Sequence, residues 1–406
     1  MQGTRDQIID TIRAVKERIF GVAVEMNERH GPRMIAQPGP SQHGIDKHDG
    51  ARSLWPRRGP WRGWRRVSGV LAAGLSIGLA LTPMGCYLSR AAIEEARILS
   101  RRTAITTLVA DSTTDPALRD KLRLVQEARR FAVDSLALTA GKSFTAFSRL
   151  DRDTLVLVVS AAYRDRLAPK TWWFPVVGRF PYKGFFDFPG ALRTAESLRN
   201  DGFDVTVGPS SAFSTLGWFN DPLVSTTVKA DSVTLVNTVL HELLHNTFFA
   251  KGQVSFNESF ATFVGARGVE HFFRARGDSV LLRRAEDEWH DDLLLGAFWE
   301  RTSNEIDRVF AALPDSASTE RIAARDTVYA RARTRLVDSI GPQLRTYPEG
   351  WVQKVTLNNA VLLSRRVYAE RLDRFDSVYV AEGRDLKRAI QRIIATHKDS
   401  VSRNDR

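Results

Sequence analysis

The chain has a single cysteine among 406 residues, which excludes an internal disulfide framework. Histidine is also scarce, with eight residues in all. The net charge of +12 comes without a basic-aromatic recognition motif, so the sequence predicts no nucleic-acid partner. Internal repeats are absent as well. Apolar residues make up 43% of the chain, which is enough for a substantial hydrophobic core.

The N-terminal part contains a segment with the features of an export signal. A basic stretch, 61–66, precedes the apolar residues 67–81, and Gly85-Cys86 follow after a short break. This order is typical of a secretory signal, and the position of Cys86 suits lipid attachment in a bacterial lipoprotein. Alternatively, residues 67–85 remain as an uncleaved membrane anchor. Both interpretations predict a protein of the bacterial cell envelope that is attached to the membrane on its periplasmic side.

Residues 1–60 precede that segment and form a predicted disordered or non-native extension. Pro, Gly, His and Arg dominate residues 38–60, a composition typical of disorder. Export signals begin near a true N-terminus, so we expect either a translation start near Met34 or beyond, or a short cytoplasmic segment ahead of an anchor. The predicted order is therefore this extension (1–60), an export or anchor segment (61–86), one domain (87–400) and a frayed tail (401–406).

The most informative pattern is His241-Glu242-Leu243-Leu244-His245. Residues four apart share one face of a helix, so both imidazoles can reach a single metal ion. Apolar residues recur at helical spacing around the pattern and predict a buried helix, capped by Asp231 or Ser232 and ended by Lys251-Gly252. Polar groups on a buried helix need compensation, and a metal ion is the simplest one. The alternative is a partly exposed helix whose polar residues face solvent.

A second acidic residue completes a ligand set. Glu258 comes thirteen residues after His245, in the first turn of a second predicted helix that Ser255 or Asn257 caps. His241, His245 and Glu258 are then the protein ligands of one Zn²⁺ ion, and the fourth tetrahedral position stays open for water, as in catalytic zinc sites. Glu242 is placed to take a proton from this water. The alternative for Glu258 is a carboxylate that the helix dipole favours.

The remaining pattern predicts an α+β fold that is mostly helical. A small mixed sheet is expected before the metal-binding helix, from an apolar run at 153–163, an aromatic-rich hairpin at 171–188 and a strand at 203–207. The helices after the motif form a predicted C-terminal lobe. Helices are expected over residues 91–102, 116–138, 191–200, 257–276, 280–313, 319–336, 356–379 and 386–396.

The order of a sheet, two zinc-bearing helices and a helical lobe is similar to that of the gluzincin, or thermolysin-like, zinc peptidases. The chain resembles more closely the bacterial predicted aminopeptidase family of membrane-associated lipoproteins, over roughly residues 85–400. The resemblance rests on several segments: Gly85-Cys86-Tyr87, residues 173–178, 181–186 and 214–223, the zinc segment, and Leu357-Asn358-Asn359-Ala360 with Tyr368. It implies a zinc-dependent aminopeptidase with a peptide or protein substrate.

A peptidase must also hold its substrate, usually as a strand added to a sheet edge near the metal. Residues 214–219 come just before the metal-binding helix and are a candidate for that edge. Gly217 would let the substrate backbone approach, with Trp218 beside it; the alternative is a plain connecting loop with a buried Trp218. An aminopeptidase needs a carboxylate for the free amine, and Asp187 and Asp221 are both available.

A donor for the developing oxyanion is a further requirement, commonly a tyrosine or histidine. Tyr368 is the first candidate and Tyr347 the second, and each could instead be a tyrosine at the edge of the core. The sequence thus predicts peptide hydrolysis with Glu242 as the base and then the acid, as in an aminopeptidase. Two alternatives stay open: an endopeptidase of the cell envelope, and a membrane-tethered binding or scaffold protein with a silent zinc site.

Overall fold

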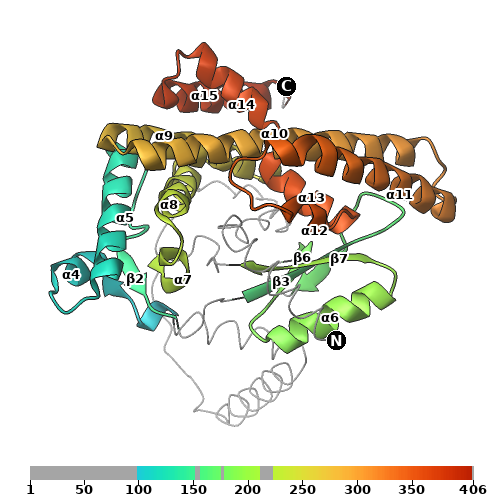
Figure 1. Ribbon diagram of the computed structural model, residues 1–406, viewed down its shortest axis with the longest axis horizontal. Coiled ribbons are helices and arrows are strands. Elements are labelled where there is room, and N and C mark those ends of the chain that lie inside the picture. The colour runs from blue at the N-terminus through green and yellow to red at the C-terminus, as the bar shows by residue number, and fades with distance from the viewer. Residues whose placement is uncertain (1–97, 151–155, 175–177, 211–222, 405–406) are drawn as a thin grey trace, which may run out of the picture. The chain divides into compact units, whose positions relative to one another are not determined.

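The computed structural model describes residues 98–150, 156–174, 178–210 and 223–404, which are mostly helical with small sheets, an α+β arrangement (Figure 1). All of these residues belong to one compact unit. The predicted extension and export segment lie outside them, and so does Cys86. No helix of the described part is long and apolar enough to cross a membrane.

The described part contains the strands β1 (Thr103–Ala104), β2 (Ala146–Ser148), β3 (Val156–Ala162), β4 (Trp172–Phe174), β5 (Gly178–Phe180), β6 (Tyr182–Phe185), β7 (Asp204–Ser210) and β8 (Leu223–Val224). They form three sheets. One is mixed, because β1 pairs antiparallel with β2 and β2 pairs parallel with β8. In the second, β3 lies between β6 and β7 and pairs antiparallel with both, while β4 and β5 form the predicted hairpin.

Helices make up most of the described residues. They are α4 (Ile105–Ala110), α5 (Pro116–Asp134), α6 (Phe188–Asn200), α7 (Ser225–Val228), α8 (Ser232–Thr247), α9 (Val254–Arg276), α10 (Ser279–Ala311), α11 (Ser318–Thr334), the π-helical turn η1 (Arg335–Ile340), the 3₁₀ turn η2 (Gly341–Gln343), α12 (Trp351–Lys354), α13 (Asn359–Ala369), α14 (Leu372–Ala381) and α15 (Leu386–Asn404).

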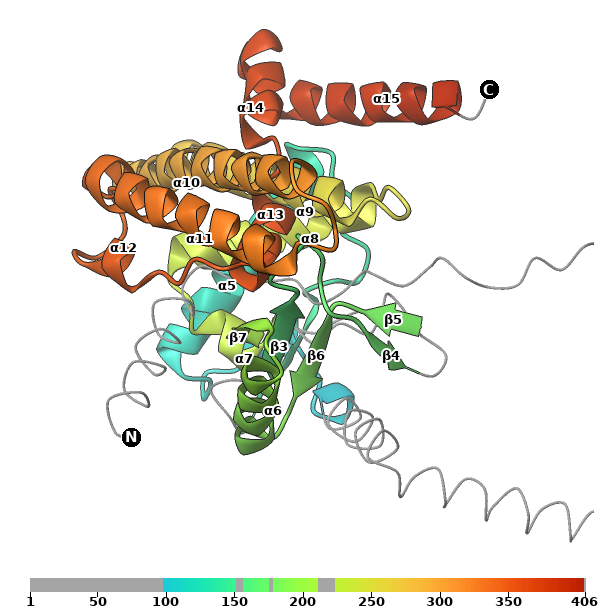
Figure 2. The same cartoon turned by 90° about the vertical axis from the view of Figure 1, so that its right-hand side faces the viewer.

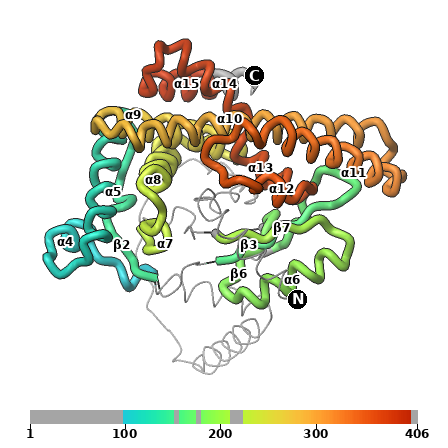
Figure 3. Tube along the Cα trace, viewed as in Figure 1, coloured from blue at the N-terminus to red at the C-terminus, as the bar shows by residue number. Residues whose placement is uncertain are grey.

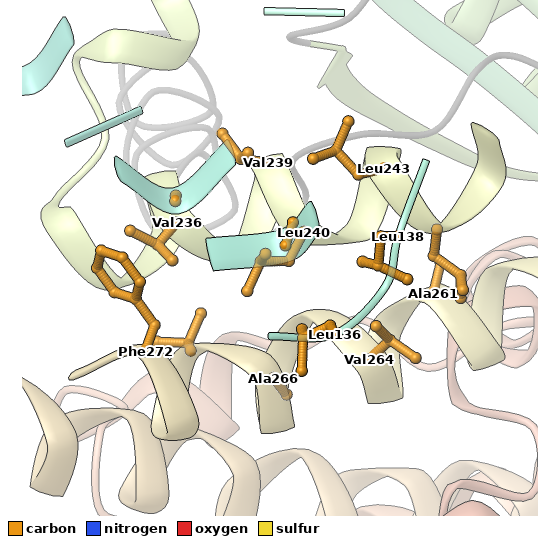
Figure 4. Close-up of a cluster of buried hydrophobic side chains, with 14 of the residues drawn as sticks. Leu136, Leu138, Val236, Val239, Leu240, Leu243, Ala261, Val264, Ala266 and Phe272 are labelled. Atoms are coloured by element: carbon orange, nitrogen blue, oxygen red, sulfur yellow. The ribbon is translucent and has the colours of Figure 1, made fainter. Parts of the chain in front are cut away.

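The main core forms around α8 and α9, the two helices that carry the predicted metal ligands. Asp231 caps α8, as predicted, by accepting hydrogen bonds from the backbone N–H groups of Val233 and Thr234. Apolar side chains of α8, α9 and the segment after α5 meet between the helices, where Figure 4 shows Leu136, Leu138, Val236, Val239, Leu240, Leu243, Ala261, Val264, Ala266 and Phe272. Full burial of each large aliphatic side chain contributes roughly 1.5–3 kcal/mol, so this interface fixes the two helices firmly.

Close approach of α8 and α9 depends on Gly265. A Cβ atom built at this position would lie 3.2 Å from the backbone carbonyl oxygen of Asn237 and closer still to its side-chain oxygen. Glycine is therefore needed where the α9 backbone passes α8. On its other flank α8 packs against α5, which lies beside it although about a hundred residues separate them (Figure 3).

α13 connects the helical layer to the second sheet. It packs against α9 and α10 on one side and against β3 and β7 on the other (Figure 1). A second core, with Phe298, Ile306, Val328, Leu336 and Leu362, joins α13 to α10, α11 and η1. α14 and α15 pack on the side of α9 that faces away from α8 (Figure 2).

Several predicted boundaries differ from the structure. The predicted helix 356–379 is wrong, because α13 ends at Ala369 and α14 begins at Leu372, with Arg371 at a φ of +58° between them. α8 ends at Thr247, ahead of the predicted Lys251-Gly252. α9 begins at Val254 without a side-chain cap, so Glu258 lies in its second turn, not its first. α15 continues to Asn404, beyond the predicted end.

Candidate metal centre

The two histidines of the motif project from one face of α8, as their spacing predicts. His241 is buried, with 6% of its surface exposed, and His245 is half-buried. Their Nε2 atoms lie 3.3 Å apart. Both imidazoles therefore point at one position beside the helix.

Glu258 reaches the same position from α9. Its Oε2 lies 3.3 Å from Nε2 of His241, and its Oε1 lies 3.6 Å from Nε2 of His245. The turn between the two helices is held by Asn257, whose side chain accepts a hydrogen bond from the Ala250 N–H at 2.8 Å and donates one to the Ala250 carbonyl at 2.9 Å. This pair of bonds sets where α9 starts and so where Glu258 lies. Asn257 thus holds the turn and does not cap α9 through its side chain.

The three side chains fit a metal ion by geometry. Atoms that bind zinc tetrahedrally at about 2.0–2.2 Å lie roughly 3.3–3.5 Å from one another, and the three separations found here are 3.3, 3.3 and 3.6 Å. Glu258 is 3% exposed, and its buried Oε2 meets no donor with hydrogen-bond geometry among the described residues. A buried carboxylate oxygen without such a bond is costly. His241, His245 and Glu258 can therefore hold a metal ion.

The electrostatics of this cluster keep Glu258 ionised. Burial raises the pKa of the Glu258 carboxyl, but the adjacent His241 and His245 lower it more, and its pKa lies below the usual value. An ionised carboxylate and neutral imidazoles are the forms that bind metal ions. The carboxyl of Glu258 is therefore in the form that binds a divalent cation.

Glu242 and Tyr368 are the other two residues that the sequence singled out for the chemistry. Glu242 is half-buried and follows His241 directly on α8. Tyr368 lies at the end of α13, and burial raises the pKa of its hydroxyl, which Glu258, Tyr182 and Glu242 raise further. Glu242 and Glu258 thus both raise the pKa of this hydroxyl, which stays protonated and able to donate a hydrogen bond. Tyr182, on β6, is a neighbour for which sequence spacing gave no signal.

The other predicted site residues are Tyr347, Asp187 and the residues predicted to bind substrate. Tyr347 packs on Trp351, with ring centroids 4.0 Å apart, at the edge of the second core. Asp187 caps α6 by accepting a hydrogen bond from the Gly190 N–H at 3.2 Å. The residues predicted to bind substrate are Gly217, Trp218 and Asp221. They lie outside the described residues, as does the candidate edge 214–219.

Two histidines outside the motif, His271 and His397, pack against aromatic side chains. His271 is half-buried, and its Nε2 lies 2.8 Å from the Tyr379 hydroxyl. His397 of α15 stacks on Phe256 with ring centroids 4.2 Å apart. Their partners come from α14 and α9, far away in sequence. Within the described ranges, His241, His245 and Glu258 form the one group with metal-ligand geometry.

Comparison with known proteins adds a family assignment. A family model described as Putative aminopeptidase matches residues 86–406, which include all three candidate ligands. Neither the curated proteins nor the solved structures contain a match. Since the family match covers well over half of the 406 residues, the chain belongs to the family described as Putative aminopeptidase.

Proposed function

We propose that the protein is a zinc-dependent peptidase, and specifically an aminopeptidase with a gluzincin-like site. The observation that carries this proposal is the convergence of His241, His245 and Glu258 with Glu242 adjacent to them on α8. Two imidazoles and one carboxylate form a donor set found in catalytic zinc sites, where three protein ligands leave one position open. The family assignment supports a peptidase.

The chain's own residues supply the remaining chemistry. Bound zinc would act as a Lewis acid that polarises the scissile carbonyl and makes a water molecule more acidic. Glu242 accepts the proton of the attacking water and then delivers it to the leaving amine. Tyr368 donates a hydrogen bond to the carbonyl oxygen as negative charge builds up on it. Its raised pKa keeps the proton on the hydroxyl throughout this step.

Substrate binding is the less defined part of the proposal. Gly217 and Trp218 are proposed to border the substrate, and Asp221 to hold its free amine, from their position just before α8 in the sequence. Asp187 is the weaker candidate for the amine, because it already caps α6. Comparison of free and N-acetylated peptides separates the aminopeptidase from an endopeptidase, which would cleave both.

Two substitutions test the core assignment in the full-length protein. Glu242→Gln should retain zinc and lose about 10²–10⁴-fold in turnover, because the general base is removed. Glu258→Ala should lower the zinc content measured by mass spectrometry. Glu196→Gln, an exposed residue of α6, is the matched control and should change neither quantity. Full turnover in Glu242→Gln, or full zinc content in Glu258→Ala, would contradict the assignment.

We also propose that residues 61–86 export the protein and that Cys86 carries a lipid that anchors it to the membrane on the periplasmic side. The basic, apolar and small residues of this segment support the proposal. Cys86→Ser should abolish incorporation of labelled palmitate in a bacterial host. A labelled Cys86→Ser variant would contradict lipidation at this cysteine, and N-terminal sequencing would identify an uncleaved anchor.

A further inference from the structure

Tyr368 lies at the end of α13, and this helix ends in an unusual way. No glycine or proline occurs from Val367 to Arg371, yet the helix stops at Ala369. Glu370 is extended, with φ of −76° and ψ of 119°, and Arg371 has a φ of +58°. The last carbonyl groups of a helix have no partner within the helix and need one from elsewhere.

Ser259 of α9 supplies that partner. Its hydroxyl donates a hydrogen bond to the Val367 carbonyl at 3.2 Å and accepts one from the Glu370 N–H at 2.9 Å. The Ser259 side chain has no solvent exposure. A single buried hydroxyl from another helix therefore satisfies one acceptor and one donor at the end of α13.

The location of this contact matters more than its strength. Ser259 directly follows Glu258, a candidate metal ligand, while Tyr368 lies between Val367 and Glu370. One hydroxyl thus joins the backbone beside the ligand to the backbone on both sides of the proposed oxyanion donor. A shift of α13 relative to α9 would strain these bonds and change the position of Tyr368 relative to Glu258.

The other end of α13 is anchored separately. The Asn359 N–H donates to Asp204 Oδ2 at 2.8 Å, and its side chain donates to the Tyr163 carbonyl at 2.7 Å and accepts from the Tyr329 hydroxyl at 2.7 Å. These contacts fix the start of α13 to the sheet and to α11. The end that carries Tyr368 is held by α9 through Ser259 and by α10, where Arg366 donates a hydrogen bond to the Ser303 hydroxyl at 3.4 Å. Of these two contacts, only the one with Ser259 reaches the backbone on both sides of Tyr368.

We propose that Ser259 is a positioning residue that sets the Tyr368 hydroxyl relative to the metal centre. This inference rests on the proposed peptidase function. An ordinary helix-capping role would also explain a buried hydroxyl at this place, but it would affect stability alone. A positioning role affects the rate of the chemical step, and does so only through Tyr368.

The test is a double-mutant cycle on peptide hydrolysis by the zinc-loaded, full-length protein. Ser259→Ala should lower kcat by about tenfold to a hundredfold, as expected when a reacting group is displaced by about 1 Å, with little change in KM. Tyr368→Phe should lower kcat by about 10²–10³-fold. The double variant should be about as slow as Tyr368→Phe alone, because Ser259 has nothing left to position.

Controls separate this role from folding and from metal loss. Ser148→Ala removes another fully buried serine hydroxyl, which donates to the Ile98 carbonyl at 2.8 Å, and should leave kcat unchanged. Ser259→Ala should keep the zinc content of the wild type, since Glu258 is untouched. Ser259→Cys retains a weak donor and acceptor of similar size and should have an intermediate kcat, which keeps the test usable if the alanine variant folds poorly.

Each outcome decides the question. Wild-type kcat in Ser259→Ala, loss of zinc in that variant, or a double variant slowed by the product of the two single effects would each overturn the positioning role while the peptidase function stands. A zinc-loaded wild type that cleaves no peptide would instead overturn the proposed function, and this role with it.

Discussion

Replacing Gly265 by alanine tests the close contact between the two helices that carry the proposed ligands. The new Cβ atom would lie 3.2 Å from the backbone oxygen of Asn237 and against its side-chain oxygen. The side chain can turn away, but the backbone oxygen moves only with α8. We therefore expect α8 and α9 to separate slightly, which shifts Glu258 relative to His241.

The magnitude follows from two opposing effects. Overpacking of a tight interface costs roughly 1–3 kcal/mol, while alanine is the better helix former by about 1 kcal/mol. The Gly265→Ala variant should therefore be less stable by up to about 2 kcal/mol, which lowers Tm by roughly 2–4 °C in a domain of this size. Its zinc affinity should fall as well.

Calorimetry and zinc titration measure the two effects. Gly296→Ala on α10 is the matched control, because its nearest neighbour is the flexible end of Leu372 at 3.3 Å. It should be as stable as the wild type, or slightly more stable, with unchanged zinc affinity. Asn237→Ala combined with Gly265→Ala should recover part of the loss. If Gly265→Ala matches Gly296→Ala in both Tm and zinc affinity, the reasoning about the interface is refuted.

Three further predictions concern stability. Asn359→Ala should lower the free energy of unfolding by about 2–4 kcal/mol, because it leaves the buried Tyr329 hydroxyl and the Tyr163 carbonyl without this partner. Asn358→Ala removes only a helix cap and should lower it by about 1 kcal/mol. Equal denaturation midpoints for the two variants would contradict this. Zinc at a hundredfold excess over its Kd should stabilise the wild type by about 2.7 kcal/mol and leave a His245→Ala variant unchanged. Burial, with Arg274 and Arg267, lowers the pKa of His271. The folded protein therefore keeps its full stability above about pH 6.5, and loses part of it as the pH falls through the lowered pKa and the buried imidazole must take up a proton. His271→Gln should therefore show a smaller drop in Tm between neutral and acidic pH, and an identical drop would exclude His271 as the cause.

The sequence was most informative where local spacing determines the structure. The helical spacing of His241 and His245 and the capping Asp231 lie within one element, so α8 was predicted nearly in full. The prediction that Glu258 reaches the same position needed only the next helix along the chain.

Features that depend on distant partners could not be predicted in this way. The break between α13 and α14 has no glycine or proline to mark it in the sequence. The hydrogen bonds that hold it come instead from Ser259, more than a hundred residues earlier. The packing of His271 on Tyr379 and of His397 on Phe256 has the same origin. Such contacts become visible only when the helices are placed in space.

The central claim is that His241, His245 and Glu258 hold one zinc ion with which the protein cleaves peptides. It is tested most directly by removing metal from the full-length chain and measuring peptide hydrolysis as zinc is added back. The account predicts no hydrolysis in the metal-free protein and a linear rise that levels off at one zinc per chain. Hydrolysis without metal, or none at full zinc occupancy, would contradict it.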